Sequence, residues 1–161
     1  MKIFISFFIV LLLSLNASSS TKADKVIVEK SQAKLLLMYQ GKVINEYHVA
    51  FGAEPKGHKK QEGDERTPEG EYVLDYKKSN SSFYKAIHIS YPNEQDKVNA
   101  KKLGVDPGGL IMIHGQKNGF GLFSFITQKF NWTNGCIAVT NSEMDEIWEA
   151  IDKNTPIEIR P

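Results

Sequence analysis

The sequence is nearly free of cysteine. Its 161 residues contain a single one, Cys136, so an internal disulfide is excluded. One cysteine and four scattered histidines also lack the paired spacing of a zinc site, and we expect no metal ion. The glycine-rich segments 107–109 and 119–121 match neither the dinucleotide-binding nor the phosphate-loop pattern, so no organic cofactor is predicted.

An excess of charge of one sign is missing too. The 20 basic and 19 acidic residues give a formal net charge of +1. Bulk charge therefore gives no reason to expect nucleic acid or an anionic membrane surface as a partner. The contents of 41% hydrophobic and 24% charged residues are those of an ordinary globular chain, and the length favours one domain.

Long hydrophobic runs are limited to one near the start, residues 3–15, which is broken by Ser6 and Ser14. This run is shorter than the roughly 18–20 apolar residues of a membrane-spanning helix. A lysine precedes it and small residues follow it, which is the order of a secretory signal. We predict a signal peptide at residues 1–23, cleaved after Ser20 or after Ala23. The alternative is an uncleaved membrane anchor.

Removal of this segment leaves residues 24–161 as one domain. We expect it to be exported to the periplasm or cell envelope and not to be an integral membrane protein. Exported proteins meet oxidising conditions, where cysteines usually pair. A leftover cysteine in such a protein suggests a reactive thiol or an intermolecular bridge. The alternative for Cys136 is a buried small hydrophobic residue.

Alternating and apolar stretches predict a mainly β fold with a few short helices. Strands are expected at residues 26–28, 33–39, 43–51, 71–76, 86–91, 110–113 and 156–159. The second and third form a hairpin about the turn at 40–42. One helix is expected at 96–103. Another follows Thr140, because Thr140 and Glu143 match a capping box before an amphipathic run.

Residues 115–135 form a long connection that is rich in large apolar side chains. We expect these side chains to fill part of the core. The alternative is that some of them wall a pocket. They are Phe120, Leu122, Phe123, Phe125, Ile126, Phe130 and Trp132.

Cys136 and His114 together are sufficient for acyl transfer. A neighbouring imidazole can take the thiol proton and later protonate a leaving amine. Each of the two residues borders an apolar run that can form a rigid strand, and each has a glycine beside it, Gly135 and Gly115, that lets a substrate approach closely. The other histidines are assigned ordinary surface or structural roles. They are His48, His58 and His88.

Two segments in this order resemble the L,D-transpeptidase catalytic domain, also called the YkuD domain. Ile113-His114-Gly115 matches the family's apolar-His-Gly segment. Residues 133–137 (TNGCI) match its Ser/Thr-His-Gly-Cys segment, with Asn134 in place of the usual histidine. The loop 63–70 (GDERTPEG) and residues 90–93 (SYPN) extend the resemblance over residues 25–161. The Gly-Cys-Ile-Ala-Val-Thr-Asn motif is similar to a branch that includes hydrolases of wall peptides or of their links to protein.

The resemblance implies a β-rich, sandwich-like fold and an exported cysteine acyltransferase that acts on peptidoglycan stem peptides. Cys136 is expected to be the nucleophile, and His114 its proton acceptor and donor. The Gly115 carbonyl is expected to orient His114. The backbone N–H groups of Gly135 and Cys136 are expected to stabilise the oxyanion.

Three alternatives differ in chemistry. A hydrolase on the same scaffold would be an L,D-carboxypeptidase or an amidase that releases wall-linked peptide or protein. A non-catalytic wall-binding module would tolerate loss of Cys136, but the chain has no repeated binding motif. A papain-like peptidase is disfavoured because His114 precedes the cysteine and the local signatures of that class are absent.

Overall fold

The computed structural model describes residues 21–161. Most of the predicted signal peptide, residues 1–20, lies outside this part of the chain. Within the described residues, no helix combines the length and the apolar character needed to cross a bilayer.

The fold is mainly β, as predicted, with three short α-helices. Two single turns of 3₁₀ helix, η1 and η2, complete the described elements. In chain order the elements are β1 (Lys25–Glu29), η1 (Lys30–Gln32), β2 (Lys34–Tyr39), β3 (Lys42–His48), β4 (Gly70–Lys78), β5 (Ala86–Ile89), α1 (Glu94–Leu103), β6 (Met112–His114), η2 (Gly121–Phe123), α2 (Ser124–Thr127), β7 (Ile137–Ala138), α3 (Asn141–Ala150) and β8 (Thr155–Arg160).

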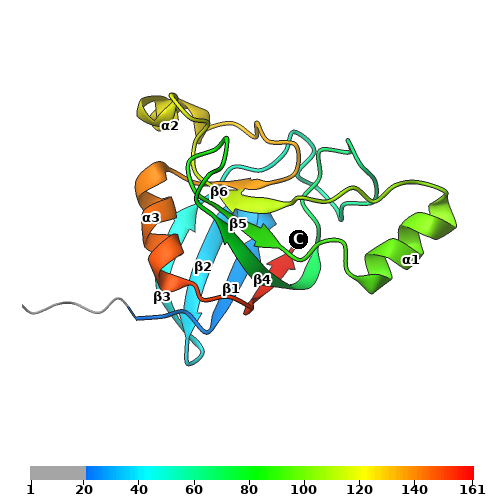
Figure 1. Cartoon of the computed structure of the whole chain (residues 1–161), viewed down its shortest axis with the longest axis horizontal. Coiled ribbons are helices and arrows are strands. Elements are labelled where there is room, and N and C mark those ends of the chain that lie inside the picture. The colour runs from blue at the N-terminus through cyan, green and yellow to red at the C-terminus, as the bar shows by residue number, and fades with distance from the viewer. Residues whose placement is uncertain (1–20) are drawn as a thin grey trace, which may run out of the picture.

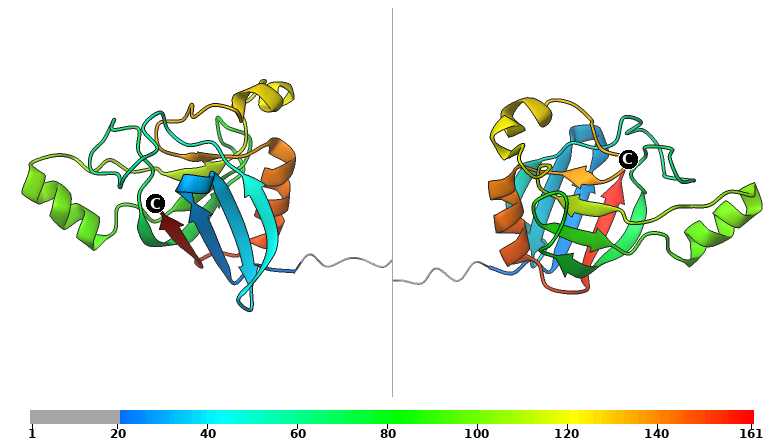
Figure 2. Two further views of the ribbon diagram at one scale, coloured as in Figure 1. Left: turned by 180° about the vertical axis from the view of Figure 1, so that it is seen from behind. Right: turned by 45° about the horizontal axis from the view of Figure 1, so that its top comes forward.

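The eight strands form one sheet that curls on itself. Its order is β3-β2-β1-β8-β4-β5-β6-β7. Just beyond β3, Ala50 exchanges two backbone hydrogen bonds of 2.9 and 2.8 Å with Ala138 of β7, so the two ends of the sheet meet. Figure 2 shows the resulting curl, in which β1, β2 and β3 face the strands β4 to β6. The two faces of the expected sandwich are therefore two halves of one sheet.

The predicted hairpin is present as β2 and β3. Its turn residues Gln40 and Gly41 have φ values of 50° and 74°, which suits the right-handed twist of the paired strands. Helix α3 begins with the predicted capping box, because Thr140 and Glu143 each bind the other's backbone N–H. It packs Met144 and Ile147, both with zero exposure, into the core. Figure 1 shows α3 at one side of the sheet, with α1 projecting at the opposite side.

Three predicted boundaries were wrong. The strand predicted at 43–51 ends at His48, because the chain leaves the hairpin there to reach Ala138. The helix predicted from residue 96 starts two residues earlier, since Asn93 supplies the cap. The strand predicted at 110–113 is Met112–His114, and Leu110 is 70% exposed with a φ of 55°.

The expectation that the large apolar side chains of residues 115–135 fill the core was also wrong. Six of the seven are exposed, from Ile126 at 47% to Leu122 at 89%. They lie on η2, α2 and the adjoining loops, which stand away from the sheet at the top of Figure 1. The segment is hydrophobic but has neither strand nor long helical periodicity. Its sequence therefore did not show whether these side chains lie on the surface or in the core. Trp132, the seventh, is half-buried beside Cys136.

Candidate active site

Strand pairing brings His114 and Cys136 to one face of the sheet. Strands β6 and β7 are parallel, with His114 opposite Ala138. Cys136 directly precedes β7, so this pairing brings it close to His114. Both residues line a cavity of about 320 Å³. Its other lining residues are Phe83, Lys117, Trp132, Thr133 and Asn134.

The orientation of His114 is fixed by its neighbour. Its Nδ1 lies 2.6 Å from the carbonyl oxygen of Gly115, which is the orienting group that the family resemblance implied. A carbonyl oxygen only accepts, so Nδ1 must carry the proton in this contact. The neutral ring then has a free lone pair on Nε2, which is the form that a general base requires.

Two aromatic rings enclose the imidazole. The centroid of Phe83 is 4.6 Å from that of His114, and the centroid of Trp132 is 5.7 Å away. His114 is only 3% exposed. Burial lowers the pKa of His114 because the charged imidazolium loses hydration, and the Gly115 carbonyl opposes this only in part.

The thiol of Cys136 is also held in its neutral form. Burial raises the pKa of Cys136, while a backbone hydrogen bond from Met112 and the positive charge of Lys59 act in the opposite direction. The Sγ lies 3.6 Å from the carbonyl oxygen of Leu110, a contact that a protonated thiol can make as donor. Both shifts therefore favour the uncharged forms, a thiol and a neutral imidazole.

A tight turn presents Cys136. Thr133 donates its hydroxyl to the carbonyl of Cys136 at 2.7 Å and accepts the N–H of Gly135 at 3.2 Å. Gly135 has a φ of 109°, and a Cβ there would lie 2.5 Å from the carbonyl oxygen of Arg66. Only glycine fits both this conformation and this contact. The Gly135 N–H is thus already partnered, and its role at an oxyanion stays a prediction.

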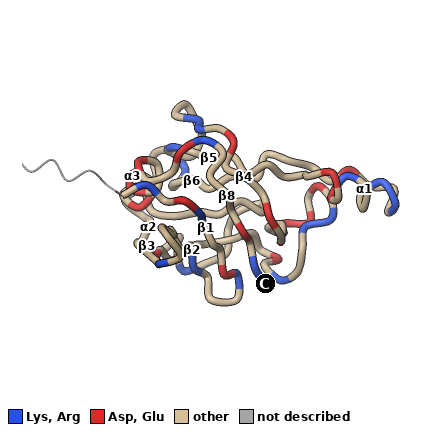
Figure 3. The backbone as a smooth tube through the Cα atoms, turned by 90° about the horizontal axis from the view of Figure 1, so that it is seen from below, with Lys and Arg blue, Asp and Glu red and all other residues tan. Residues whose placement is uncertain are grey.

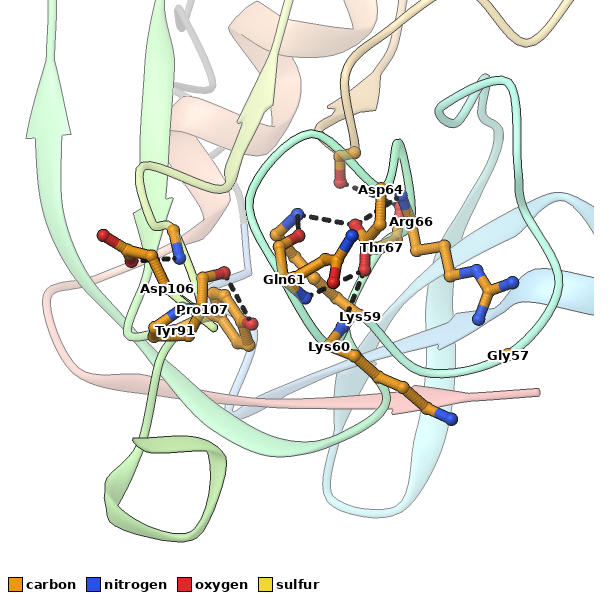
Figure 4. Close-up of polar contacts among 12 residues, drawn as sticks. Gly57, Lys59, Lys60, Gln61, Asp64, Arg66, Thr67, Tyr91, Asp106 and Pro107 are labelled. Atoms are coloured by element: carbon orange, nitrogen blue, oxygen red, sulfur yellow. Dashed lines mark hydrogen bonds and ion pairs between the residues drawn. The ribbon is translucent and has the colours of Figure 1, made fainter. Parts of the chain in front are cut away.

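The loop of residues 59–67 clamps this turn from outside. The hydroxyl of Thr67 donates to the carbonyl of Gly135 at 2.9 Å. The loop is itself organised by Asp64, whose carboxylate accepts from the ammonium of Lys59 at 2.8 Å and from the backbone N–H groups of Lys60, Gln61 and Arg66. Figure 4 shows these groups around Asp64. Burial alone would raise the pKa of Asp64, but the Lys59 ammonium and the backbone hydrogen bonds together outweigh it and lower the pKa.

Sequence reasoning assigned no role to three residues that build the site. Thr67 and Asp64 stand in the segment 63–70, which carried part of the family resemblance and so offered a signal. Phe83 lies in a polar loop and offered none. Trp132 was included only among the large apolar side chains expected in the core.

The remaining histidines are engaged elsewhere. His48 contacts the carbonyl of Gln128 at 3.1 Å, and His88 pairs with Asp75 at 2.7 Å. His58 accepts the N–H of Glu69 and contacts Asp96. Within residues 21–161, no cluster of three or more His, Cys, Asp and Glu side chains is placed to hold a metal ion.

The YkuD model, described as the L,D-transpeptidase catalytic domain, matches residues 23–159. The chain belongs to this family. YafK of Escherichia coli strain K12 is 29% identical over 114 residues, which are 70% of this chain and 39% of YafK. YqjB of Bacillus subtilis strain 168 is 28% identical over 136 residues, which are 82% of this chain and 68% of YqjB.

Solved structures agree on the fold. Pgp2 of Campylobacter jejuni, described as a helical cell shape determining protein, is 30% identical, with a TM-score of 0.63 over 84% of this chain and 46% of that one. An L,D-transpeptidase of Xylanimonas cellulosilytica has a TM-score of 0.57 at 16% identity over 88% of this chain and 62% of that one, and shares the fold. The chain spans about two-fifths of YafK and under half of Pgp2. Its family is that of catalytic domains that modify peptidoglycan.

Proposed function

We propose that this protein is an exported L,D-transpeptidase in which Cys136 transfers acyl groups between peptidoglycan stem peptides, with His114 as its base. The observation that carries the proposal is that one cavity is lined by a half-buried thiol and by an imidazole whose Nδ1 is engaged by a carbonyl. The Gly115 carbonyl leaves Nε2 of His114 as the basic atom. Family membership supplies the substrate class.

The first half-reaction makes a thioester. His114 Nε2 takes the proton of the Cys136 thiol as Sγ attacks the carbonyl carbon that follows an L-centre. The C–N bond breaks, and the same proton passes from His114 to the leaving amine. A backbone N–H beside Sγ stabilises the oxyanion, and we assign this role to the N–H of Cys136. The N–H of Gly135 can contribute as well if its hydrogen bond to the Thr133 hydroxyl breaks.

The second half-reaction resolves the thioester. An amine of a second stem peptide attacks the carbonyl carbon and gives its proton to His114. The C–S bond breaks, and the proton returns to Cys136. No cofactor takes part in either half-reaction, because both steps move only protons and one acyl group.

Hydrolysis is a second candidate, and Asn134 favours it. This residue stands where the family usually has histidine, lines the Cys136 cavity and is exposed. If water rather than an amine resolves the thioester, the protein is an L,D-carboxypeptidase or an amidase acting on wall-linked peptide or protein. The similarity to Pgp2 supports a role of either activity in cell shape.

Product analysis separates these outcomes. Purified protein is incubated with stem-peptide fragments and an excess of amine acceptor, and the products are measured by mass spectrometry. Cross-linked dimers support transfer, whereas shortened peptides alone support hydrolysis. We expect Cys136→Ala and His114→Ala to abolish both products, and His48→Ala, which changes a histidine outside the cavity, to retain activity. Full activity in Cys136→Ala would refute the proposal.

A further inference from the structure

Two lysine side chains are buried in the part of the chain that the structure describes. Basic and acidic residues are interspersed along most of this part (Figure 3). Lys59 and Lys30 are nevertheless only 3% and 7% exposed. Lys59 belongs to the loop of residues 59–67, where it pairs with Asp64. Lys30 comes from η1 and is not among the seven residues that line the Cys136 cavity, so its burial needs another explanation.

The ammonium of Lys30 makes three hydrogen bonds, as many as it has hydrogens. It donates to the Gly57 carbonyl at 2.7 Å, to the Thr67 carbonyl at 3.1 Å and to the Glu69 carboxylate at 2.7 Å. No donor is left for a ligand. Gly57 stands just before the loop of residues 59–67, and Glu69 stands just after it. Lys30 therefore ties the two ends of this loop together.

The sheet explains how a lysine of η1 reaches this loop. Ile159 of β8 pairs with Val28 of β1 on one side and with Gly70 of β4 on the other. The turn η1 follows β1 directly, and β4 begins directly after Glu69. Lys30 and Glu69 therefore meet across one end of β8. Because β1 is hydrogen-bonded to strands on both sides, the lysine extends from within the sheet and not from its edge.

Thr67 connects Lys30 to the turn that presents Cys136. Its carbonyl accepts from Lys30, and its hydroxyl donates to the Gly135 carbonyl at 2.9 Å. Thr67 has zero exposure, and a buried carbonyl that loses its donor is costly. The Gly135 carbonyl belongs to the peptide group that also contains the N–H of Cys136. A displacement of Thr67 is therefore passed directly to that peptide group.

We propose that Lys30 is a positioning residue that sets the direction of the Cys136 N–H through Thr67. This role rests on the proposed function, in which that N–H stabilises the oxyanion. The Gly135–Cys136 peptide bond is trans, and a trans peptide group is planar with its carbonyl and its N–H pointing in opposite directions. Fixing the Gly135 carbonyl therefore fixes the Cys136 N–H. An oxyanion donor is effective when it is already aimed at the developing charge.

The first test measures turnover of a stem-peptide fragment by purified protein. We expect Lys30→Met to lower kcat by roughly 10- to 100-fold, less than the outright loss of an oxyanion donor. KM should be nearly unchanged, because Lys30 does not line the cavity. Lys30→Met/Glu69→Gln, which leaves no unpaired carboxylate, should show the same loss. Lys25→Met removes a different ion pair, that of Lys25 with Glu158 at 2.6 Å, and should keep the wild-type kcat.

A double-mutant cycle tests whether Lys30 acts through Thr67. Thr67→Val removes the hydroxyl that binds Gly135 and keeps the carbonyl that binds Lys30. We expect Lys30→Met to lower kcat little further in the Thr67→Val background, because both changes release the same peptide group. Urea unfolding establishes that each variant is folded under the assay conditions. Two losses of kcat that multiply overturn the proposal, and so does a Lys30→Met protein that is less stable but turns over like the wild type.

A spectroscopic measurement separates this role from the proposed reaction. Cys136 is the only cysteine, so protein labelled with ¹⁵N-cysteine gives one backbone amide signal. We expect Lys30→Met and Thr67→Val to shift this signal and Lys25→Met to leave it in place. These shifts support the link from Lys30 to Cys136 even if the wild-type protein turns over no stem peptide. An unmoved signal in Lys30→Met overturns the link and leaves the acyl-transfer proposal in place.

Discussion

Replacing Gly135 with alanine tests whether the loop of residues 59–67 sets the position of Cys136. Two costs arise in the folded state. A side chain at φ 109° is strained by about 1–3 kcal/mol. The new Cβ would also lie 2.5 Å from the Arg66 carbonyl oxygen, and overpacking of this kind costs roughly 1–3 kcal/mol. We expect Gly135→Ala to lower the free energy of unfolding by about 2–6 kcal/mol, a large part of the roughly 5–15 kcal/mol of a domain.

Two other glycines separate these costs. Gly41 has a φ of 74°, and a Cβ there would have no neighbouring atom within 4 Å, so Gly41→Ala measures strain alone. We expect this strain to cost about 1–2 kcal/mol. Gly52 does not have a positive φ, but its Cβ would lie 1.9 Å from the Glu65 carbonyl oxygen. That Cβ would also lie 2.8 Å from the backbone nitrogen of Gly135, so Gly52→Ala measures collision without backbone strain, with both the loop and the turn. Urea unfolding gives all three values.

The thiol supplies the functional readout. Cys136 is the only cysteine, so alkylation by iodoacetamide reports its exposure and ionisation without background. We expect Gly135→Ala and Gly52→Ala to change the alkylation rate and to lower turnover, and Gly41→Ala to leave both unchanged. If Gly135→Ala were no more destabilising than Gly41→Ala and its thiol reacted as in the wild type, the loop would not hold the turn in the way that these contacts require.

Two further predictions concern pH and processing. The pKa of His114 lies below its ordinary 6.5, so activity should persist on the acid side of pH 6.5. The pKa of Cys136 lies above its ordinary 9.0, so alkylation should rise only above about pH 9. A thiolate already formed near pH 6 would contradict this. We also expect cleavage after Ser20 and not after Ala23. Ala23 is 6% exposed and donates its N–H to the carbonyl of Ala150 at 2.9 Å, and N-terminal sequencing of the exported protein decides between the sites.

The sequence predicted the strands and the family well because those signals are local. The turn at Gln40-Gly41 and the capping box at Thr140 depend on neighbours within four residues, and both are present in the structure. The closure of the sheet through Ala50 and Ala138 was not predictable in this way. It joins residues 88 positions apart, and neither alanine has a side chain that marks it for pairing.

The same limit applies to the site. His114 and Cys136 could be chosen as candidates from residue type and from the glycines beside them, and the structure places both in one cavity. The residues that support this pair could not be chosen in the same way. Thr67 and Phe83 reach the site from distant segments, and threonine and phenylalanine have no functional role at most positions of a protein. The prediction that the aromatic side chains of residues 115–135 are buried was wrong for a physical reason. Transfer from water favours burial of such residues in general. Where a given aromatic residue finds a partner surface depends on tertiary structure.

The neutral state of the pair explains how a single cysteine can serve in the exported enzyme proposed above. Oxidation and disulfide exchange proceed through the thiolate, and burial keeps Cys136 protonated. Attack is still possible, because the unprotonated Nε2 of His114 is ready to take the proton when a substrate carbonyl is in place. The same desolvation favours the neutral thiol and the neutral imidazole, so in the proposed reaction the arrival of the substrate triggers proton transfer. A permanent thiolate–imidazolium pair would be exposed to oxidants at all times, whereas in the proposed reaction the pair ionises when the substrate binds.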